Sequence, residues 1–325
     1  MNKHTLIPVS VLLTIVTFTS CGRENVKGNI QEEIIESPFI QGLTLNNYPK
    51  VDGSTSTEPL NVIIACRLLG IEYKWIWRSD GRGVEPSLDK KNSETFRKLI
   101  KSSQTHQSFI NLIDKKADLI LSARKMSSDE KTYADTLGVN LIETPIALDA
   151  FIFIVNPENL ITSLTIKQVQ DIYTGKITYW NEVGGNDEEI TPYVRNANSG
   201  SQELMETLVM KDADIIDLPE NSFELIFSMA GALDMVMHDL NSICYTVFYY
   251  KEWIANDRSP KSIAIEEIYP DYKTISDKSY PYVAEVYAVI RSDLDKLSMA
   301  YKLYEWIQTE TGKQIVNESG YIPYY

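Results

Sequence analysis

Three short segments rich in serine and threonine each stand directly before a stretch with apolar residues at helical spacing. The segments read GSTST at residues 53–57, SSQTH at 102–106 and RNANSGS at 195–201. The first N–H groups of a helix lack partners within the helix and the helix dipole is positive there, so a bound anion is stabilised. Hydroxyls add adjustable donors, and the fork of an arginine matches the oxygens of a tetrahedral anion. The chemistry that these residues favour is capture of an oxyanion.

Helix capping is the competing explanation for each segment, because serine and threonine are preferred N-caps whatever the function. Capping alone would explain any one of the three. Capping does not require four consecutive hydroxyls, such as those at residues 54–57. Nor does it require an arginine four residues before a Ser-Gly-Ser sequence, such as Arg195. We therefore predict that the three helix starts converge on one ligand.

The elements that would position these segments follow an α/β pattern, since strand-like apolar runs alternate with helix-period segments from residue 51 onward. We expect strands at residues 73–77, 119–122, 150–155, 193–195 and 282–290, and helices at residues 59–69, 104–113, 166–173, 202–210 and 294–308.

Two lobes are expected because a chain of 325 residues is near the size at which a single core becomes hard to sustain. The β-rich runs at 147–155 and 281–289 are the expected crossings between the lobes. The first lobe would then be discontinuous, with residues 47–149 plus 280–325, and the second lobe would hold residues 150–279.

The amino terminus has the features of an export signal. A short polar start precedes an apolar run that ends near residue 18, which is too short to span a bilayer. The sequence FTSC at residues 18–21 resembles a bacterial lipobox, so we expect residues 1–20 to be a signal peptide and Cys21 to carry a lipid. An ordinary cleaved signal is the alternative. Residues 21–46 would form a tether.

Composition excludes several classes of protein. The net charge of −14 disfavours a nucleic acid as partner, because such proteins usually carry a basic face. The histidines are isolated from one another, so we expect no metal site and no cofactor. Cys66 and Cys244 lie in apolar surroundings and are expected to be buried thiols, although a disulfide between them stays open.

Four segments carry a resemblance to a known family: DGSTSTEPL at residues 52–60, ADLILSARKMS at 117–127, LTI with IYTGKITYWNEVGG between 164 and 185, and GKQIV with GYIP between 312 and 323. Over most of residues 51–323 the chain resembles the phosphate-binding proteins of ABC importers, in the type II periplasmic binding protein superfamily. The resemblance implies a two-lobed α/β (Venus-flytrap) fold with two hinge-crossing strands. The sequence TGK at 174–176 is not a P-loop, because the upstream glycine is missing and Gly175 fits the end of a helix.

The resemblance also implies the ligand-binding residues, with donors from both lobes so that binding would be coupled to closure. Those from the first lobe are Thr55, Ser56 and Thr105, and those from the second are Arg195, Ser199, Gly200 and Ser201.

One departure from the family concerns the acceptor of the proton of hydrogen phosphate. Many members have an aspartate where this chain has Ala123. Arg124 would supply a second positive charge, or else form a structural salt bridge, and Asp149 at the expected hinge is a substitute acceptor.

The function that follows is an exported, lipid-anchored, monomeric binding protein. It would capture phosphate or a related oxyanion and deliver it to the permease of an ABC importer, touching the membrane only through its lipid. Three alternatives stay open: another oxyanion such as sulfate, molybdate or a phosphonate; a phosphate sensor or storage protein without a permease; and a phosphate-ester hydrolase. The last finds support only in His106, which lies beside the expected site, since no nucleophile and base stand in a recognisable motif.

Overall fold

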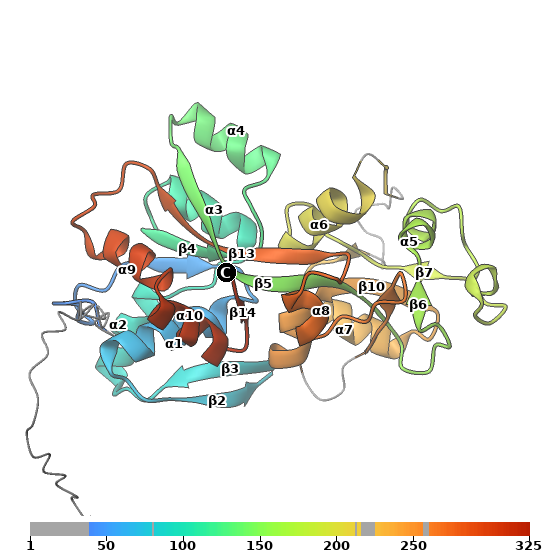
Figure 1. Cartoon of the computed structure of the whole chain (residues 1–325), viewed down its shortest axis with the longest axis horizontal. Helices are drawn as coiled ribbons and strands as arrows, with labels where there is room; N and C mark the ends of the chain where they lie inside the picture. Colours follow the sequence, from blue (N-terminus) through green and yellow to red (C-terminus); the bar gives the residue numbers. More distant parts are fainter. Residues whose placement is uncertain (1–38, 80, 212, 216–224, 256–259) are drawn as a thin grey trace, which may run out of the picture. The chain divides into compact units, whose positions relative to one another are not determined.

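The computed structural model describes residues 39–79, 81–211, 213–215, 225–255 and 260–325 (Figure 1). These residues all belong to one unit that begins at residue 37. The expected signal peptide, the lipidation site at Cys21 and the first part of the tether lie outside the described residues, so these expectations stay predictions.

The main sheet has the strand order β1-β4-β13-β5-β10-β7, and β11 and β14 also pair with β5. Its strands are β1 (Val51–Gly53), β4 (Leu119–Ser122), β5 (Leu141–Val155), β7 (Thr191–Pro192), β10 (Ser242–Val247), β11 (Lys261–Ser262), β13 (Val283–Arg291) and β14 (Ile322–Pro323).

Strand β5 joins the two halves of this sheet. Its residues 141–150 pair antiparallel with β13, and its residues 151–155 pair antiparallel with β10. Figure 1 shows β5 and β13 running from the elements around β4 towards those around β10. The last ten residues of β5 are all buried, as expected for a strand covered on both faces. The strand expected at 150–155 is therefore the end of a strand that begins nine residues earlier.

The α-helices lie around this sheet, and the described helices include none that is both long and apolar enough to cross a membrane. They are α1 (Glu58–Leu69), α2 (Lys90–Leu99), α3 (Thr105–Ile113), α4 (Ser128–Thr136), α5 (Ile166–Tyr173), α6 (Gly200–Leu204), α7 (Met229–His238), α8 (Tyr272–Ser276), α9 (Met299–Ile307) and α10 (Glu310–Glu318), with short helical turns η1 (Trp180–Val183), η2 (Met205–Met210) and η3 (Tyr250–Ile254).

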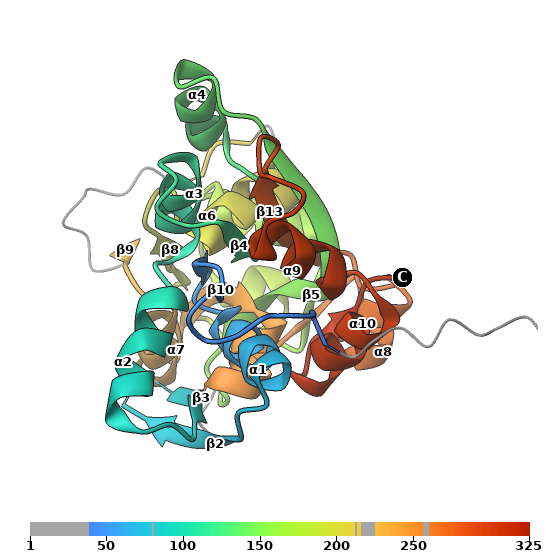
Figure 2. The same cartoon turned by 90° about the vertical axis from the view of Figure 1, so that its left-hand side faces the viewer.

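Three pairs of strands lie outside the main sheet. They are the hairpin of β2 (Tyr73–Arg78) and β3 (Gly81–Pro86), the pair of β6 (Ser163–Leu164) and β12 (Ala264–Ile265), and the pair of β8 (Val194–Arg195) and β9 (Leu225–Ile226). Helix α2 lies beside the hairpin in both views (Figure 2).

Two expected helices differ by more than one residue from those in the structure. The helix expected at 294–308 begins only at Met299, because the Ser298 hydroxyl caps it by accepting the N–H of Tyr301 at 3.2 Å. The helix expected at 202–210 is divided between α6 and the π-helical turn η2. By contrast, Gly175 follows α5 with a φ of 72°, which confirms that it ends a helix.

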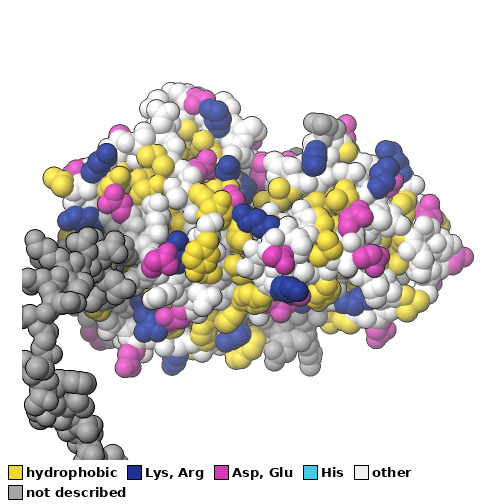
Figure 3. Space-filling model, in the orientation of Figure 1, with side chains coloured by type: hydrophobic (Ala, Val, Ile, Leu, Met, Phe, Trp, Pro, Cys, Tyr) yellow, Lys and Arg dark blue, Asp and Glu magenta, His cyan; other side chains and the backbone are white. Residues whose placement is uncertain are grey.

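Both described cysteines are buried and free, so Cys66 and Cys244 form no disulfide with each other. The acidic excess is not gathered on the face drawn in Figure 3, where basic and acidic side chains are interspersed with hydrophobic ones.

Candidate functional site

A cavity of about 530 Å³ lies where the starts of four helices meet. It is lined by residues 54–56 before α1, residues 104–107 at the start of α3, residues 195–201 before and within α6, and residues 227–230 at the start of α7. The structure thus brings together the three hydroxyl-rich segments singled out in the sequence. Of the expected ligand-binding residues, those that line this pocket are Thr55, Ser56, Thr105, Arg195, Ser199, Gly200 and Ser201.

The loop between β1 and α1 is held in place through Ser54, which is 2% exposed. The Ser54 N–H donates to the carbonyl of Leu121 at the end of β4, at 3.0 Å. The Ser54 hydroxyl accepts the N–H of Ala123 at 3.0 Å and the Thr105 hydroxyl at 2.9 Å. One serine therefore fixes the positions of two helix starts and of the end of a strand.

The start of α3 is in close contact with the start of α6. Gln104 adopts a φ of 68°, and the helix begins at the next residue, Thr105, which is buried. A Cβ atom placed on Gly200 would lie 2.6 Å from the Thr105 Oγ1 atom, closer than van der Waals contact allows. Glycine at this position therefore lets the two helix starts approach each other.

Arg195 brings a buried positive charge to the pocket. The residue is 5% exposed, its Nε donates to the carbonyl of Ile226 at 3.1 Å, and its Nη1 is buried with no hydrogen-bond partner among the described residues. No carboxylate of the described residues forms an ion pair with it. Burial lowers the pKa of this guanidinium, since the charged form is poorly solvated. A bound anion would offset that cost.

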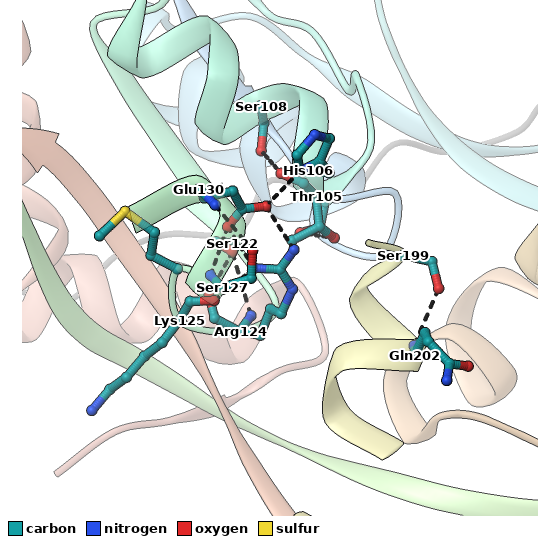
Figure 4. A network of polar contacts seen from close by, with 12 residues as sticks. Thr105, His106, Ser108, Ser122, Arg124, Lys125, Ser127, Glu130, Ser199 and Gln202 are labelled. Carbon is teal, nitrogen blue, oxygen red and sulfur yellow. Dashed lines mark hydrogen bonds and ion pairs between the residues drawn. The ribbon is translucent and has the colours of Figure 1, made fainter. Parts of the chain in front are cut away.

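Arg124 does not line this pocket. Its guanidinium donates to both oxygens of Glu130, each at 2.8 Å, and both side chains are buried. Glu130 also accepts the N–H of Ser127 at 2.8 Å and lies 3.0 Å from Nδ1 of His106 (Figure 4). The expected alternative, a structural salt bridge, describes this geometry better than a ligand contact does.

Asp149 does not line the pocket either. Its Oδ1 accepts the N–H groups of Ala150 at 2.8 Å and Tyr249 at 2.9 Å, while its Oδ2 is buried without a partner among the described residues. Burial raises the pKa of this carboxyl group to about 7. Its contacts are those of a buried group within the crossing strand β5.

Two parts of the pocket were missed in the sequence. Ser54 belongs to the first hydroxyl cluster, but nothing in its local sequence distinguishes it from its neighbours. The start of α7 contributes Phe227, Ser228, Met229 and Ala230. Its only sequence cue is Ser228, which caps the helix by accepting the N–H of Gly231 at 2.9 Å. A single serine is too common at helix starts to indicate a site. The described residues contain no group of His, Cys, Asp and Glu that could hold a metal ion.

Comparison with known proteins identifies the family of this chain. The family model for the PBP superfamily domain matches residues 84–309. The chain belongs to the PBP superfamily. This PBP chain is 25% identical over 216 residues to the phosphate-binding protein PstS of Borreliella burgdorferi. The match covers 65% of this chain and 74% of the relative. It is also 25% identical to PstS of Staphylococcus epidermidis over 99% of the chain and 89% of the relative.

Solved structures support the same fold. An ABC-type phosphate transport receptor from Vibrio cholerae has a TM-score of 0.59 and 22% identity, and the match covers 84% of this chain and 98% of that one. A structure with bound phosphate from Clostridium perfringens, assigned to a phosphate ABC transporter, has a TM-score of 0.62 and 23% identity, over 85% and 98% of the two chains. The two-lobed α/β fold and the family resemblance expected from the sequence are confirmed. The boundaries given for the lobes stay a prediction.

Proposed function

We propose that this PBP protein binds inorganic phosphate, or a closely related tetrahedral oxyanion, in the pocket between its helix starts. The observation that carries the proposal is Arg195, a buried guanidinium with an unpaired Nη1 in a pocket lined by serine and threonine. Desolvating a cation without a partner is costly, and hydrogen bonds to an anion offset that cost.

The names of the relatives support phosphate as the ligand. The curated proteins cited above are phosphate-binding proteins, and the Clostridium perfringens structure contains bound phosphate. The ligand-binding residues that we assign are Thr55, Ser56, Thr105, Arg195, Ser199, Gly200 and Ser201. Arg124 is not among them, because its guanidinium is bound by Glu130.

Isothermal titration calorimetry with phosphate and the purified protein tests this proposal. Arg195→Ala is expected to weaken phosphate binding by more than about tenfold, because hydrogen bonds to a charged group contribute roughly 1.5–3 kcal/mol each. Arg97 is an exposed arginine of α2 that does not line the pocket, so Arg97→Ala is the matched control and should bind phosphate as the wild type does. Equal affinities of the wild type and Arg195→Ala would refute our placement of the site.

We further propose that the protein is exported, lipid-anchored through Cys21, and delivers its ligand to the permease of an ABC importer. Support comes from the lipobox-like sequence and from the transport proteins among the relatives. Cys21→Ala should move the protein from the detergent phase to the aqueous phase in a phase-partition assay. Retention of the variant in the detergent phase would exclude this cysteine as the anchor. Co-purification with the permease subunits tests delivery against a role in sensing or storage.

Binding without catalysis is the remaining part of the proposal. The imidazole of His106 is engaged with the buried Glu130, so this histidine is expected to hold the start of α3 in place. Incubation with a phosphate monoester such as p-nitrophenyl phosphate should give no turnover above background. Turnover that disappears in His106→Asn would favour the hydrolase instead.

A further inference from the structure

Four aromatic rings connect the β2–β3 hairpin with the first loop of the anion pocket. The rings of Trp75 and Trp253 have their centroids 5.8 Å apart. The ring of Tyr249 stacks on that of Trp253 at 6.3 Å and on that of Tyr321 at 3.7 Å. This aromatic column ends at the Tyr321 hydroxyl, which donates to the carbonyl of Ser56 at 3.1 Å. Because Ser56 lines the pocket, the column supports a ligand-binding loop from behind.

The ring of Trp253 is fixed against the segment that precedes Tyr321. Its Nε1 donates to the Tyr272 hydroxyl at 2.6 Å, and that hydroxyl donates to the carbonyl of Gly320. A Cβ atom on Gly320 would lie 2.3 Å from the Trp253 ring, so glycine is needed for this close approach. The position of η3, which contains Trp253, is therefore linked to the position of the segment before Tyr321.

The turn η3 also connects a second wall of the pocket with the hairpin. Its first residue, Tyr250, lines the pocket. Its last residue, Ile254, touches the hairpin, since a Cβ atom on Gly81 would lie 2.3 Å from the Ile254 carbonyl oxygen. The hairpin lies beside α1 in both views (Figure 1 and Figure 2), and Arg78 donates to the carboxylate of Glu58 at the start of that helix, at 2.7 Å. The hairpin thus contacts elements of two walls without lining the pocket itself.

We propose that Trp75 and Trp253 are positioning residues for the anion pocket, which act through the aromatic column on the loop that contains Ser56. The inference rests on the proposed function and adds that the hairpin responds to the ligand. An anion held between this loop and Tyr250 fixes both ends of the column, so the contact between the two tryptophan rings changes when the anion binds. If the rings served packing alone, they would affect stability but not the response to an anion.

Calorimetry with phosphate, on the purified full chain, tests the effect on affinity. Trp75→Leu should weaken binding by about 2- to 10-fold, the size expected for the loss of one aromatic pair, and Trp75→Phe should restore most of the affinity. Trp77→Leu is the matched control, because Trp77 is 54% exposed, lies outside the column and shares the contact of Trp75 with the Arg82 guanidinium. This control should bind phosphate as the wild type does.

A double-mutant cycle tests whether the effect travels through the column. Tyr321→Phe removes only the hydroxyl that donates to Ser56. The losses of binding free energy from Trp75→Leu and Tyr321→Phe should therefore not add in the double variant.

Tryptophan fluorescence measures the response of the hairpin itself. Phosphate should change the emission of the wild type and of Trp77→Phe. When Trp75→Phe and Trp253→Phe are combined, phosphate should still bind in calorimetry, but the emission of the remaining tryptophans should not change.

The inference is overturned if Trp75→Leu binds phosphate as the wild type does, if Trp75→Leu and Trp77→Leu are weakened equally, or if the two losses in the cycle add fully. It is also overturned if the wild type binds phosphate without a change in emission, or if the variant that lacks both tryptophans keeps that change. Should Trp75→Leu fail to fold in urea titration, the phenylalanine variants decide the question. Absence of phosphate binding to the wild type would contradict the proposed function itself, and is therefore a distinct result.

Discussion

The buried carboxyl group of Asp149 should make the stability of this protein depend on pH in a direction that is unusual for an aspartate. Burial raises its pKa to about 7 in the folded chain, whereas an exposed aspartate has a pKa of about 4. Between these two values the folded protein holds a proton that the unfolded chain has released. Unfolding therefore releases a proton, and the free energy of unfolding falls as the pH rises towards 7.

The magnitude follows from the same two pKa values. From pH 5 to pH 8 the unfolded carboxyl group is ionised throughout, while the folded one loses its proton near pH 7. Between pH 5 and pH 7 unfolding releases one proton. Over these two pH units the free energy of unfolding therefore falls by about 3 kcal/mol. The side-chain amide of the variant Asp149→Asn cannot ionise, but its oxygen can still accept the N–H groups of Ala150 and Tyr249. The variant should therefore gain about 3 kcal/mol over the wild type between pH 5 and pH 8.

Urea unfolding of the ligand-free protein, followed by tryptophan fluorescence at several pH values between 5 and 8, measures this difference. Asp135→Asn is the control, since it removes the same formal charge from a side chain that is 60% exposed. Its curve of stability against pH should run parallel to that of the wild type. A constant difference between Asp149→Asn and the wild type over this range would show that the group does not change its ionisation on unfolding, and would refute the reasoning.

Three further outcomes are expected. Gly200→Ala should weaken phosphate binding at least about tenfold in calorimetry, because the added Cβ would lie 2.6 Å from the Thr105 hydroxyl oxygen. In the double variant with Thr105→Ala the losses of binding free energy from the two substitutions should not add, and full additivity would contradict the steric explanation. Glu130→Gln leaves a buried guanidinium short of its carboxylate and should lower the free energy of unfolding by about 3–5 kcal/mol in urea titration, while a loss under about 1 kcal/mol would show that the pair is dispensable. Burial raises the pKa of the Cys66 and Cys244 thiols to about 12, so neither should react with a thiol reagent in the native protein at pH 8, and both should react in urea; rapid labelling of the native protein would contradict their burial.

The helix starts that line the pocket could be predicted because each depends on local sequence. Hydroxyl clusters mark helix starts through capping, and a glycine beside them marks close approach, so the segments around Thr55, Thr105 and Ser199 were recognisable before their positions were known. The alternation of strands and helices was predictable for the same reason, since each element has its own period.

The features that could not be predicted depend on contacts between residues that are distant in sequence, or on which of several neighbouring residues caps a helix. From the sequence alone Arg124 is a candidate ligand-binding cation, but the fold places the carboxylate of Glu130 against its guanidinium. The long strand β5 was only partly recognised, because none of its first five residues is buried and only its later residues form a buried, largely apolar run.

The contact between Tyr321 and the first ligand loop bears on how the protein becomes active during synthesis. The Tyr321 hydroxyl donates to the carbonyl of Ser56 at 3.1 Å, across 265 positions of the chain, and its ring stacks on that of Tyr249 at 3.7 Å. A nascent chain that stops before this tyrosine lacks the support beneath the loop, however completely its earlier segments have folded. Competence to hold an anion should therefore arise only after the ribosome has released the segment that contains Tyr321.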